Sequence, residues 1–457
     1  IRYTGYKLEE LSAEFPITIG PQEPMFSDGW LGTDSEIAFE LSGLDFAEEV
    51  QPLDVSLKLE RLRYPINVPG EPLIEGHFLI DQITPENEQI PLALNNIEQS
   101  FALRGDMLEL TGTLNESTRA LTITSDAKYS LSSGELFVRI NPAGVSFDNA
   151  DRFADLIAPY DPPIALVTGQ MESSFELDWN VKGPVENLTV RGSVEFTNIG
   201  GAYNDYYFSG LDGAYSGSVY PVIASDDTSV ITVTQLDAGV AVRDLKAVLS
   251  LNQLNSNRAN GFADGLEVQL FSVLANTMGG YIAIKPAQIN FADQQHELSM
   301  LLIGIDIDTL LREQEWEEVI ASGKLSGEIP LLINDDGLRV TGGRVYAAEP
   351  GGKIQYTGDV DALSLAAGPA GFVFEALQDF HYGSMNIYPE YSPDGSLKMR
   401  LEVRGNNPQV EQGRPINFNI NLEQNLLKLR ESLRYVDGLN DEIDEKVQAF
   451  YRNNPNK

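Results

Sequence analysis

Apolar and polar residues alternate with a period of two through most of this chain, and this pattern constrains the fold more than any other feature. In residues 397–404 every odd-numbered residue is apolar and every even-numbered residue is charged, and residues 416–422 alternate apolar residues with asparagine. Successive side chains of a β-strand point to opposite faces, so each segment predicts a strand with one apolar and one polar face. Similar segments recur from residue 37 onward. We therefore predict a mainly β chain of antiparallel strands.

The number of these segments limits the architecture. Roughly twenty or more strands are expected, whereas open twisted sheets rarely exceed about ten strands without curling or splitting. Stacked sandwiches, a closed barrel and one long curled sheet with an apolar interior all satisfy the same period, and sandwiches are the most frequent of the three. No long linker rich in proline or serine interrupts the chain, so we expect one continuous body.

Helices are expected at only a few places. Residues 149–158 place three apolar side chains on one helical face, Asp308 can cap a helix that extends toward Ile320, and Pro369 can open another. Beyond these, leucines spaced by three and four residues predict an amphipathic tail at the C-terminus. The predicted segments are a β segment (1–304), a second β segment with two short helices (305–422) and a helical tail (423–457).

Acidic residues dominate the charge of the chain. Lys and Arg together number 31 and Asp and Glu number 68, which gives a net charge of −37. Binding to nucleic acid phosphates requires basic patches, so nucleic acid is excluded as the expected partner. Like charge on a polar face also keeps exposed strand edges from aggregating. We therefore interpret the carboxylates as a solvated face.

Residues that could carry out catalysis are scarce. His77, His296 and His381 are far apart in the sequence, and neither a G-x-S-x-G motif nor a phosphate-binding glycine loop occurs. The chain has no cysteine, which argues against a zinc site. Residues 334–337 match only the start of a calcium loop and are better interpreted as a turn. We predict no catalytic residue, no bound metal and no cofactor.

The cellular compartment can be inferred only in outline. Absence of cysteine fits a compartment in which thiols oxidise, such as a periplasm. The chain contains no run of about 18 apolar residues, the length that a membrane-spanning helix requires. The chain shows no signal peptide and begins with Ile1 rather than Met. We expect a fragment or processed product that lacks an N-terminal membrane anchor.

Several blocks in the C-terminal third resemble a known family. Residues 323–331 (GKLSGEIPL), 337–345 (GLRVTGGRV) and 349–356 (EPGGKIQY) are similar to a block of the AsmA-like proteins of Gram-negative bacteria. The following motifs resemble the YdbH-like branch of that family. They are residues 376–382 (ALQDFHY), 405–408 (GNNP) and 417–423 (NFNINLE), with a less specific similarity at 198–203 (NIGGAY).

This resemblance implies a specific fold and function. It implies a long curled antiparallel sheet, apolar inside and polar outside, that forms an open groove. It also implies a periplasmic protein, anchored in the inner membrane, that carries glycerophospholipids to the outer membrane. A small outer-membrane lipoprotein is the implied partner at the C-terminal edge strand. The family also bears an older dicarboxylate-transport label, which no residue of this chain supports.

From the alternation and the resemblance together, we predict the residues that line the groove and those that meet the partner. The predicted lining residues are Phe175, Leu177, Val194, Phe196, Met385, Ile387, Leu397, Met399, Leu401, Val403, Ile416, Phe418 and Ile420. The predicted partner contacts are the edge strand at residues 416–422 and the helix residues Leu422, Leu426, Leu429 and Leu433.

Three interpretations stay open at the level of sequence, and each predicts a different effect of substitution. In a lipid groove, a charge at Leu401 or Phe418 should abolish transport without unfolding the protein. In a structural or interaction protein of the cell envelope, built from stacked sandwiches, the same substitutions should unfold it because its interior is fully packed. In an enzyme on a β scaffold, replacing His381 should remove a measurable activity.

Overall fold

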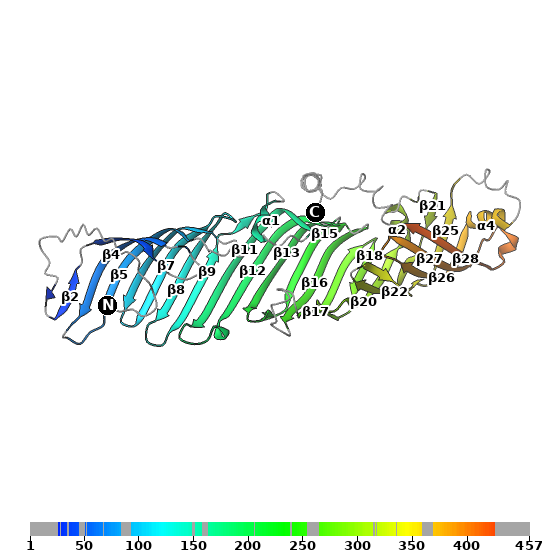
Figure 1. Ribbon diagram of the computed structural model, residues 1–457. Helices are drawn as coiled ribbons and strands as arrows, with labels where there is room; N and C mark the ends of the chain where they lie inside the picture. The colour runs from blue at the N-terminus through cyan, green and yellow to red at the C-terminus, as the bar shows by residue number, and fades with distance from the viewer. Residues whose placement is uncertain are drawn as a thin grey trace. The chain divides into compact units, whose positions relative to one another are not determined.

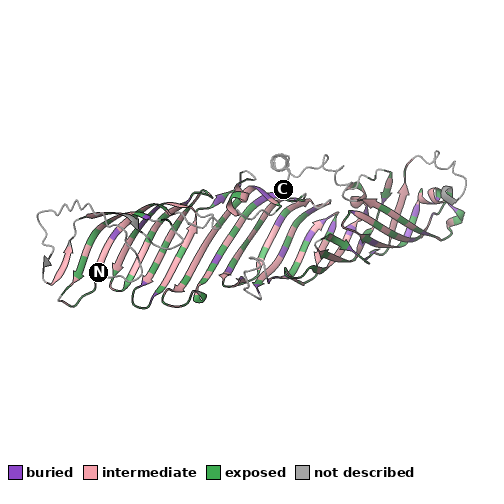
Figure 2. Cartoon of the chain, in the orientation of Figure 1, coloured by how far each residue is buried: buried purple, intermediate pink, exposed green. Residues whose placement is uncertain are grey.

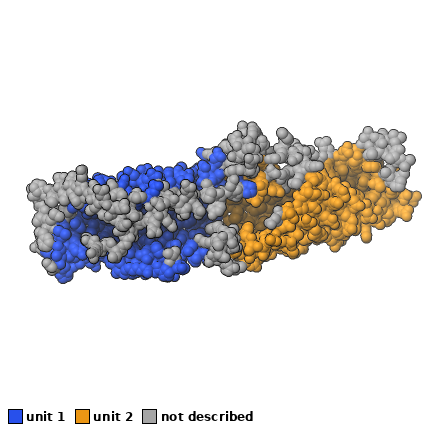
Figure 3. Space-filling model, viewed as in Figure 1, with its two compact units in different colours: residues 1–165, 169–196, 214–226 blue, residues 166–168, 197–213, 227–457 orange. Residues whose placement is uncertain are grey.

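The computed structural model describes residues 26–27, 29–33, 36–44, 51, 53–66, 68–83, 93–148, 151–157, 163–204, 206–237, 240–253, 265–313, 316, 318–334, 336–358 and 369–425. Most of these residues lie in antiparallel strands. This confirms the predicted mainly β chain with a long antiparallel sheet and few helices. The chain divides into two compact units, coloured separately in Figure 3: unit 1 is 1–165, 169–196 and 214–226, and unit 2 is 166–168, 197–213 and 227–457.

Unit 1 is a meander in which strands lie side by side in chain order (Figure 1). Its elements are β1 (Phe26–Ser27), β2 (Trp30–Thr33), β3 (Ile37–Leu44), β4 (Leu53–Pro65), β5 (Leu73–Ile83), β6 (Leu94–Arg104), β7 (Met107–Glu116), β8 (Leu121–Ser130), β9 (Glu135–Pro142), β10 (Val145–Ser146), α1 (Asp151–Ile157) and β14 (Ala224–Ser225). The strands β11 (Ile164–Asn180), β12 (Thr189–Tyr203) and β13 (Tyr206–Tyr220) contribute residues to both units. From β3 to β9 each strand pairs with the next, and β9 then pairs with β11.

Polar turns keep consecutive hairpins of unit 1 in register. β6 and β7 are joined by a two-residue turn in which Gly105 has φ 62°, a left-handed conformation that suits tight hairpins. The carboxylate of Asp106, the other turn residue, accepts hydrogen bonds from the hydroxyls of Ser130 at 2.7 Å and Ser132 at 2.6 Å. Ser130 ends β8 and Ser132 lies in the turn after it, so the bonds tie one hairpin turn to the next. A side chain therefore faces the same side of the sheet as its partners on neighbouring strands.

Unit 2 is also built of antiparallel strands, and several of them are only three to five residues long. Its elements are β15 (Ser229–Asp237), β16 (Ala241–Gln253), β17 (Leu266–Thr277), β18 (Gly280–Ile284), β19 (Ala287–Asn290), β20 (Gln295–Asp306), α2 (Ile307–Glu313), β21 (Val319–Ala321), β22 (Lys324–Asn334), β23 (Gly337–Val340), β24 (Arg344–Ala347), β25 (Gly352–Tyr356), α4 (Pro369–Leu377), β26 (Phe380–Tyr391), β27 (Ser396–Asn406) and β28 (Ile416–Asn425). β26 pairs with β23, β24 and β25 along one edge and with β27 along the other.

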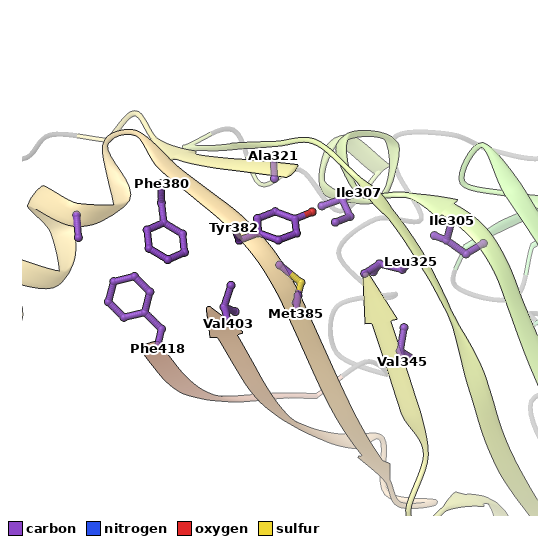
Figure 4. Close-up of a cluster of buried hydrophobic side chains, with 11 residues drawn as sticks. Ile305, Ile307, Ala321, Leu325, Val345, Phe380, Tyr382, Met385, Val403 and Phe418 are labelled. Carbon is purple, nitrogen blue, oxygen red and sulfur yellow. The ribbon is translucent and has the colours of Figure 1, made fainter. Parts of the chain in front are cut away.

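The main hydrophobic core described lies in unit 2. Eleven buried side chains from α2, α4 and the strands around β26 pack together, and Figure 4 shows ten of them labelled. The rings of Phe380 and Phe418 lie 4.9 Å apart between centroids. We call these residues the packed cluster. Its members are Ile305, Ile307, Ala321, Leu325, Val345, Ala376, Phe380, Tyr382, Met385, Val403 and Phe418.

The three predicted helices exist, but one of them begins and ends earlier than expected. α1 and α4 lie at their predicted positions, and α4 begins at Pro369. α2 begins at Ile307 because Asp306, and not Asp308, accepts the N–H of Thr309 at 2.9 Å. The continuation toward Ile320 was wrong, because that β-branched residue lies in β21 and pairs with β25. The predicted helical tail lies largely beyond Asn425, outside the described residues.

Candidate functional site

One face of the unit 1 sheet consists of rows of apolar side chains that cross successive strands. We call the rows defined below the apolar face. The first row is Phe39, Leu57, Phe78, Gln99, Gly112, Ser125, Ile140 and Phe175. The second row is Ile37, Leu59, Gly76, Phe101, Leu110, Ala127, Val138 and Leu177. The third row is Leu62, Ile74, Leu103, Leu108, Tyr129, Leu136 and Trp179.

Large apolar side chains of these rows are only partly buried. In the three rows only Gln99 and Gly76 are buried, and every Leu, Ile, Val, Phe, Tyr and Trp retains some contact with solvent. Figure 2 shows the resulting alternation of intermediate and exposed residues along the strands. From β2 to β9, the strands make their close contacts with strands to which they are hydrogen-bonded. The protein therefore leaves this apolar surface incompletely covered by its own described strands.

The opposite face of unit 1 carries alternating charges. Arg61 on β4 contacts Glu75 on β5 at 2.9 Å, and Glu75 contacts Arg104 on β6 at 2.8 Å. Arg104 then contacts Glu109 on β7 at 3.4 Å, and Glu109 contacts Lys128 on β8 at 3.5 Å. Each exposed pair contributes at most about 1 kcal/mol. Their consistent placement shows that this face is charged and in contact with water.

Four predicted lining residues belong to the apolar face of unit 1 or extend it. Phe175 and Leu177 end the first and second rows. Val194 and Phe196 follow on β12, where both are partly buried and alternate with the exposed Glu195. The same face of β12 includes Gly192, which lies against the ring of Phe175.

The other nine predicted lining residues share one face of unit 2, but the structure separates them into two groups. Met385, Val403 and Phe418 face one another across β26, β27 and β28, and they belong to the packed cluster with exposures of 6%, 2% and 8%. Four others pack against that cluster: Ile387, Leu401, Ile416 and Ile420. Leu397 and Met399 lie toward the other end of β27, are partly buried and are not among the cluster's residues. The protein's own side chains thus fill one part of this face.

The predicted partner edge is a paired strand with one described neighbour. β28 pairs with β27 over ten residues, and the described part of the chain includes no second strand paired with β28. Leu422, predicted as a helix residue, lies instead in β28, where it is partly buried and pairs with Met399. The predicted helix residues Leu426, Leu429 and Leu433 lie outside the described residues.

The described carboxyl groups with lowered pKa values lie in turns and ion pairs and do not gather in one pocket. Burial disfavours the charge of Glu116, but N–H groups of Arg119 at 2.5 Å, Ala93 at 3.2 Å and Thr118 at 3.2 Å outweigh it, so the pKa of this carboxyl is lowered. Hydrogen bonds from the Ser132 and Ser130 side chains lower the pKa of Asp106. These two carboxylates fix the ends of β7.

The histidine and tyrosine positions show the same structural use. Lys353 contacts Asp379 at 2.6 Å and holds the pKa of that carboxyl below its usual range, while His381 contacts the same carboxylate at 3.2 Å from an exposed position. Burial raises the pKa of Tyr382 to about 12, and its hydroxyl donates to the carbonyl of Ser322 at 2.7 Å. Among the described residues, no group of three His, Asp or Glu side chains could hold a metal ion.

Sequence reasoning missed most of the apolar face. The strands that carry Phe39, Phe78 and Phe101 were recognisable by alternation, but pairing register decides which residues form one row. Gln99 and Ser125 were also missed, since a polar pair inside an apolar row gives no periodic signal. Their side chains are joined by a 3.0 Å hydrogen bond across Gly112.

Comparisons with known proteins agree with the surface just described. The part of the chain that the structure describes includes no helix long and apolar enough to cross a membrane. Comparison with curated proteins gave no match, and comparison with solved structures gave none either. The family model described as "YdbH-like: Intermembrane phospholipid transport protein YdbH" matches residues 73–448, which is most of the chain and includes parts of both units. The chain therefore belongs to the YdbH-like family of intermembrane phospholipid transport proteins.

Proposed function

We propose that phospholipid acyl chains lie against the apolar face and move along it from strand to strand. One observation carries this proposal: the large apolar side chains of three successive rows are only partly buried, and no described strand packs over them. Leaving such a surface in water costs about 25 cal/mol per Å². An acyl chain gains about 0.8 kcal/mol for each buried methylene group, and the charged face opposite offers it no comparable surface.

Repetition of the same surface from strand to strand supports movement. Each of the second-row strands from β6 to β11 presents a similar residue: Phe101, Leu110, Ala127, Val138 and Leu177. Successive strands therefore each offer an apolar contact, and an acyl chain that advances by one strand, about 4.8 Å, exchanges one such contact for the next. Headgroups stay in water on this proposal, so no headgroup-specific pocket is required.

Lipid contact in unit 2 is proposed for the uncovered part of its face. Leu397 and Met399 are the predicted lining residues that lie apart from the packed cluster. The lipid would then lie beside the packed cluster, which includes Met385, Val403 and Phe418, and would not lie on it. Between the two would lie Ile387, Leu401, Ile416 and Ile420. In unit 1 the residues proposed to contact the lipid include Phe175, Leu177, Val194 and Phe196.

A matched pair of substitutions on β7 tests the proposal. Leu110 is on the apolar face, and its neighbour Thr111 is on the charged face beside Asp126. Leu110→Arg should greatly reduce phospholipid that co-purifies with the full chain, measured by extraction and mass spectrometry. Thr111→Arg should retain it. Circular dichroism should show both variants folded; equal lipid content in the two folded variants, or wild-type protein without lipid, contradicts the proposal.

The partner belongs to the same proposal. We propose that a small outer-membrane lipoprotein adds a strand to β28, whose outer edge has no described pairing. The chain has no cysteine, so a single Cys reports one site. Asn419→Cys on β28 should cross-link to the lipoprotein in the cell envelope, whereas Thr111→Cys on the interior strand β7 should not. Equal cross-linking at both sites, or none at Asn419→Cys, argues against strand addition there.

Location and alternatives follow from the family. An intermembrane transport protein is a periplasmic protein of the cell envelope, and attachment to the inner membrane through an N-terminal anchor is part of the proposal. The family description names transport and no catalysis. A structural sandwich is less favoured because its apolar faces would be packed against each other. Lipid-free protein with a fully protected apolar face would revive it.

A further inference from the structure

Three glycines of unit 1, two of them in the rows of the apolar face and one on β12 beside those rows, each receive the end of a longer side chain from a neighbouring strand. A Cβ atom placed on Gly76 would lie 3.0 Å from the ring of Phe101, and one on Gly112 would lie 2.9 Å from the side-chain carbonyl carbon of Gln99. A Cβ on Gly192 would lie 2.9 Å from the ring of Phe175. Glycine in a strand often marks such a close approach.

These contacts keep the covering side chains low on the sheet. A side chain on a strand normally stands roughly perpendicular to the sheet. Phe101, Gln99 and Phe175 can lean over a neighbouring strand because the position there has no side chain. The same rings standing upright would occupy the space above the apolar face, where acyl chains are proposed to lie.

Gly192 differs from the other two glycines in what its missing side chain would meet. A Cβ on Gly76 or Gly112 would also collide with a backbone carbonyl oxygen, of Lys58 or Glu98, so the sheet itself requires glycine at both positions. For Gly192, the three nearest atoms are two atoms of the Phe175 ring and Cγ1 of Val219 at 3.4 Å. Its backbone has no left-handed φ. The close approach of Phe175 is therefore the main demand for glycine here.

We infer that Gly192 is a positioning residue. By lacking a side chain it lets the Phe175 ring lie flat on the sheet, and this sets how much space remains for an acyl chain above the end of the first row. The inference rests on the proposed function, because it assigns these two residues a role only if acyl chains pass over them. Phe175 is partly buried, so its other ring surface remains available to an acyl chain. A side chain at position 192 would lift the ring into that space.

Substitutions at the two positions test this role on the full chain. Gly192→Ala should lower by about four-fold the equilibrium constant for phospholipid at this position, the effect of losing the burial of one methylene group, measured with limiting lipid as the yield of a photoreactive acyl chain cross-linked there. Phe175→Leu changes a lining residue and therefore serves as the reference, and the double variant should bind as much lipid as Phe175→Leu alone because the smaller side chain leaves room for the added methyl group. Gly144→Ala is the matched control, since a Cβ there meets nothing closer than 3.7 Å.

The outcomes separate this inference from the proposed function. Wild-type protein without lipid sinks the proposed function. Lipid-loaded wild type together with an equally loaded Gly192→Ala variant overturns only the role of Gly192. If Gly192→Ala loses lipid but the double variant fails to recover it, glycine is required there for the backbone and not to make room for the Phe175 ring. The inference then also fails. Thermal melting of each variant shows whether lost lipid merely follows lost stability.

Discussion

At the scale of single residues, similar side chains in similar patterns have different roles. Leu177 and Phe418 both alternate with polar residues. Leu177 is partly exposed on the apolar face, whereas Phe418 is buried against Phe380. The expectation that a charge at Phe418 would spare the fold therefore changes, because a charge there would be buried without a partner. The expectation for Leu401 changes in the same way, because Leu401 packs against the cluster that includes Phe418.

Phe418→Ala is accordingly predicted to destabilise the protein and to spare lipid binding. Truncating a buried phenylalanine in a packed core costs about 3–5 kcal/mol. Leu177→Ala should cost clearly less, because Leu177 is already partly exposed, and it should weaken lipid retention. Urea denaturation and lipid extraction on the same preparations check both. Equal destabilisation by the two substitutions would show that the apolar face of unit 1 is packed.

Glu116 gives a residue-scale prediction about pH. Its side chain is 2% exposed and accepts three backbone N–H groups. Because its folded pKa is lowered, its contribution to stability is present above the ordinary glutamate pKa of about 4.3 and is lost as pH falls through the folded pKa. Glu116→Gln should cost about 1–3 kcal/mol at pH 7.

This cost should shrink toward acid pH, since the wild-type carboxyl then becomes neutral as well. Urea denaturation of both proteins at pH 7 and near the lower limit of folding measures the difference. Glu172→Gln on β11, where the glutamate is exposed, serves as the control and should change little. A cost for Glu116→Gln that stays constant with pH would mean that charge is not what the turn requires.

At the scale of elements, short helices determine which part of the unit 2 sheet is covered by the packed cluster. α4 places Ala376 in the packed cluster, and the buried Asn407 fixes the end of this helix. The Asn407 amide donates to the carbonyls of Glu375 at 3.3 Å and Ala376 at 3.1 Å, and its oxygen accepts the N–H of Gln409 at 2.8 Å. One side chain thus joins α4 to the loop after β27.

Asn407→Ala should loosen α4 and destabilise the protein by about 1–3 kcal/mol, because buried carbonyls lose their donor. Asn407→Asp should also be unfavourable, since a carboxylate faces the two carbonyl oxygens without N–H groups to donate. Amide hydrogen exchange should show faster exchange in α4 than in β5–β7 of the same variant. Unchanged exchange in α4 would mean that the helix is held by its apolar contacts alone.

At the scale of the whole molecule, net charge and apolar area act on different parts of a phospholipid. The chain carries a net charge of −37, and the described ion pairs lie on the face opposite the apolar rows. Acyl burial does not depend on headgroup charge, whereas an anionic headgroup is repelled over distances of about a Debye length, ~10 Å at 0.1 M salt.

Selectivity between lipids should therefore change with salt. Incubation of the full chain with vesicles of mixed zwitterionic and anionic phospholipid should load mainly zwitterionic lipid at low ionic strength. The anionic fraction should rise as salt screens the repulsion, while total bound lipid changes little. Mass spectrometry of extracted lipid gives the ratio. A salt-independent ratio would show that headgroups lie beyond the field of the carboxylates.

The sequence by itself determined that the chain is built of antiparallel strands with one apolar and one polar face, because the period of two follows from local backbone geometry. It also carried the motifs of the family. Only the tertiary structure decided which apolar residues form rows, because pairing register joins residues far apart in the chain, such as Phe78 and Gln99. It also decided which of them are covered: Phe418 is buried by residues near α4, some forty positions earlier, whereas Leu177 is not. Alternation cannot encode what lies above a face, since that depends on distant segments.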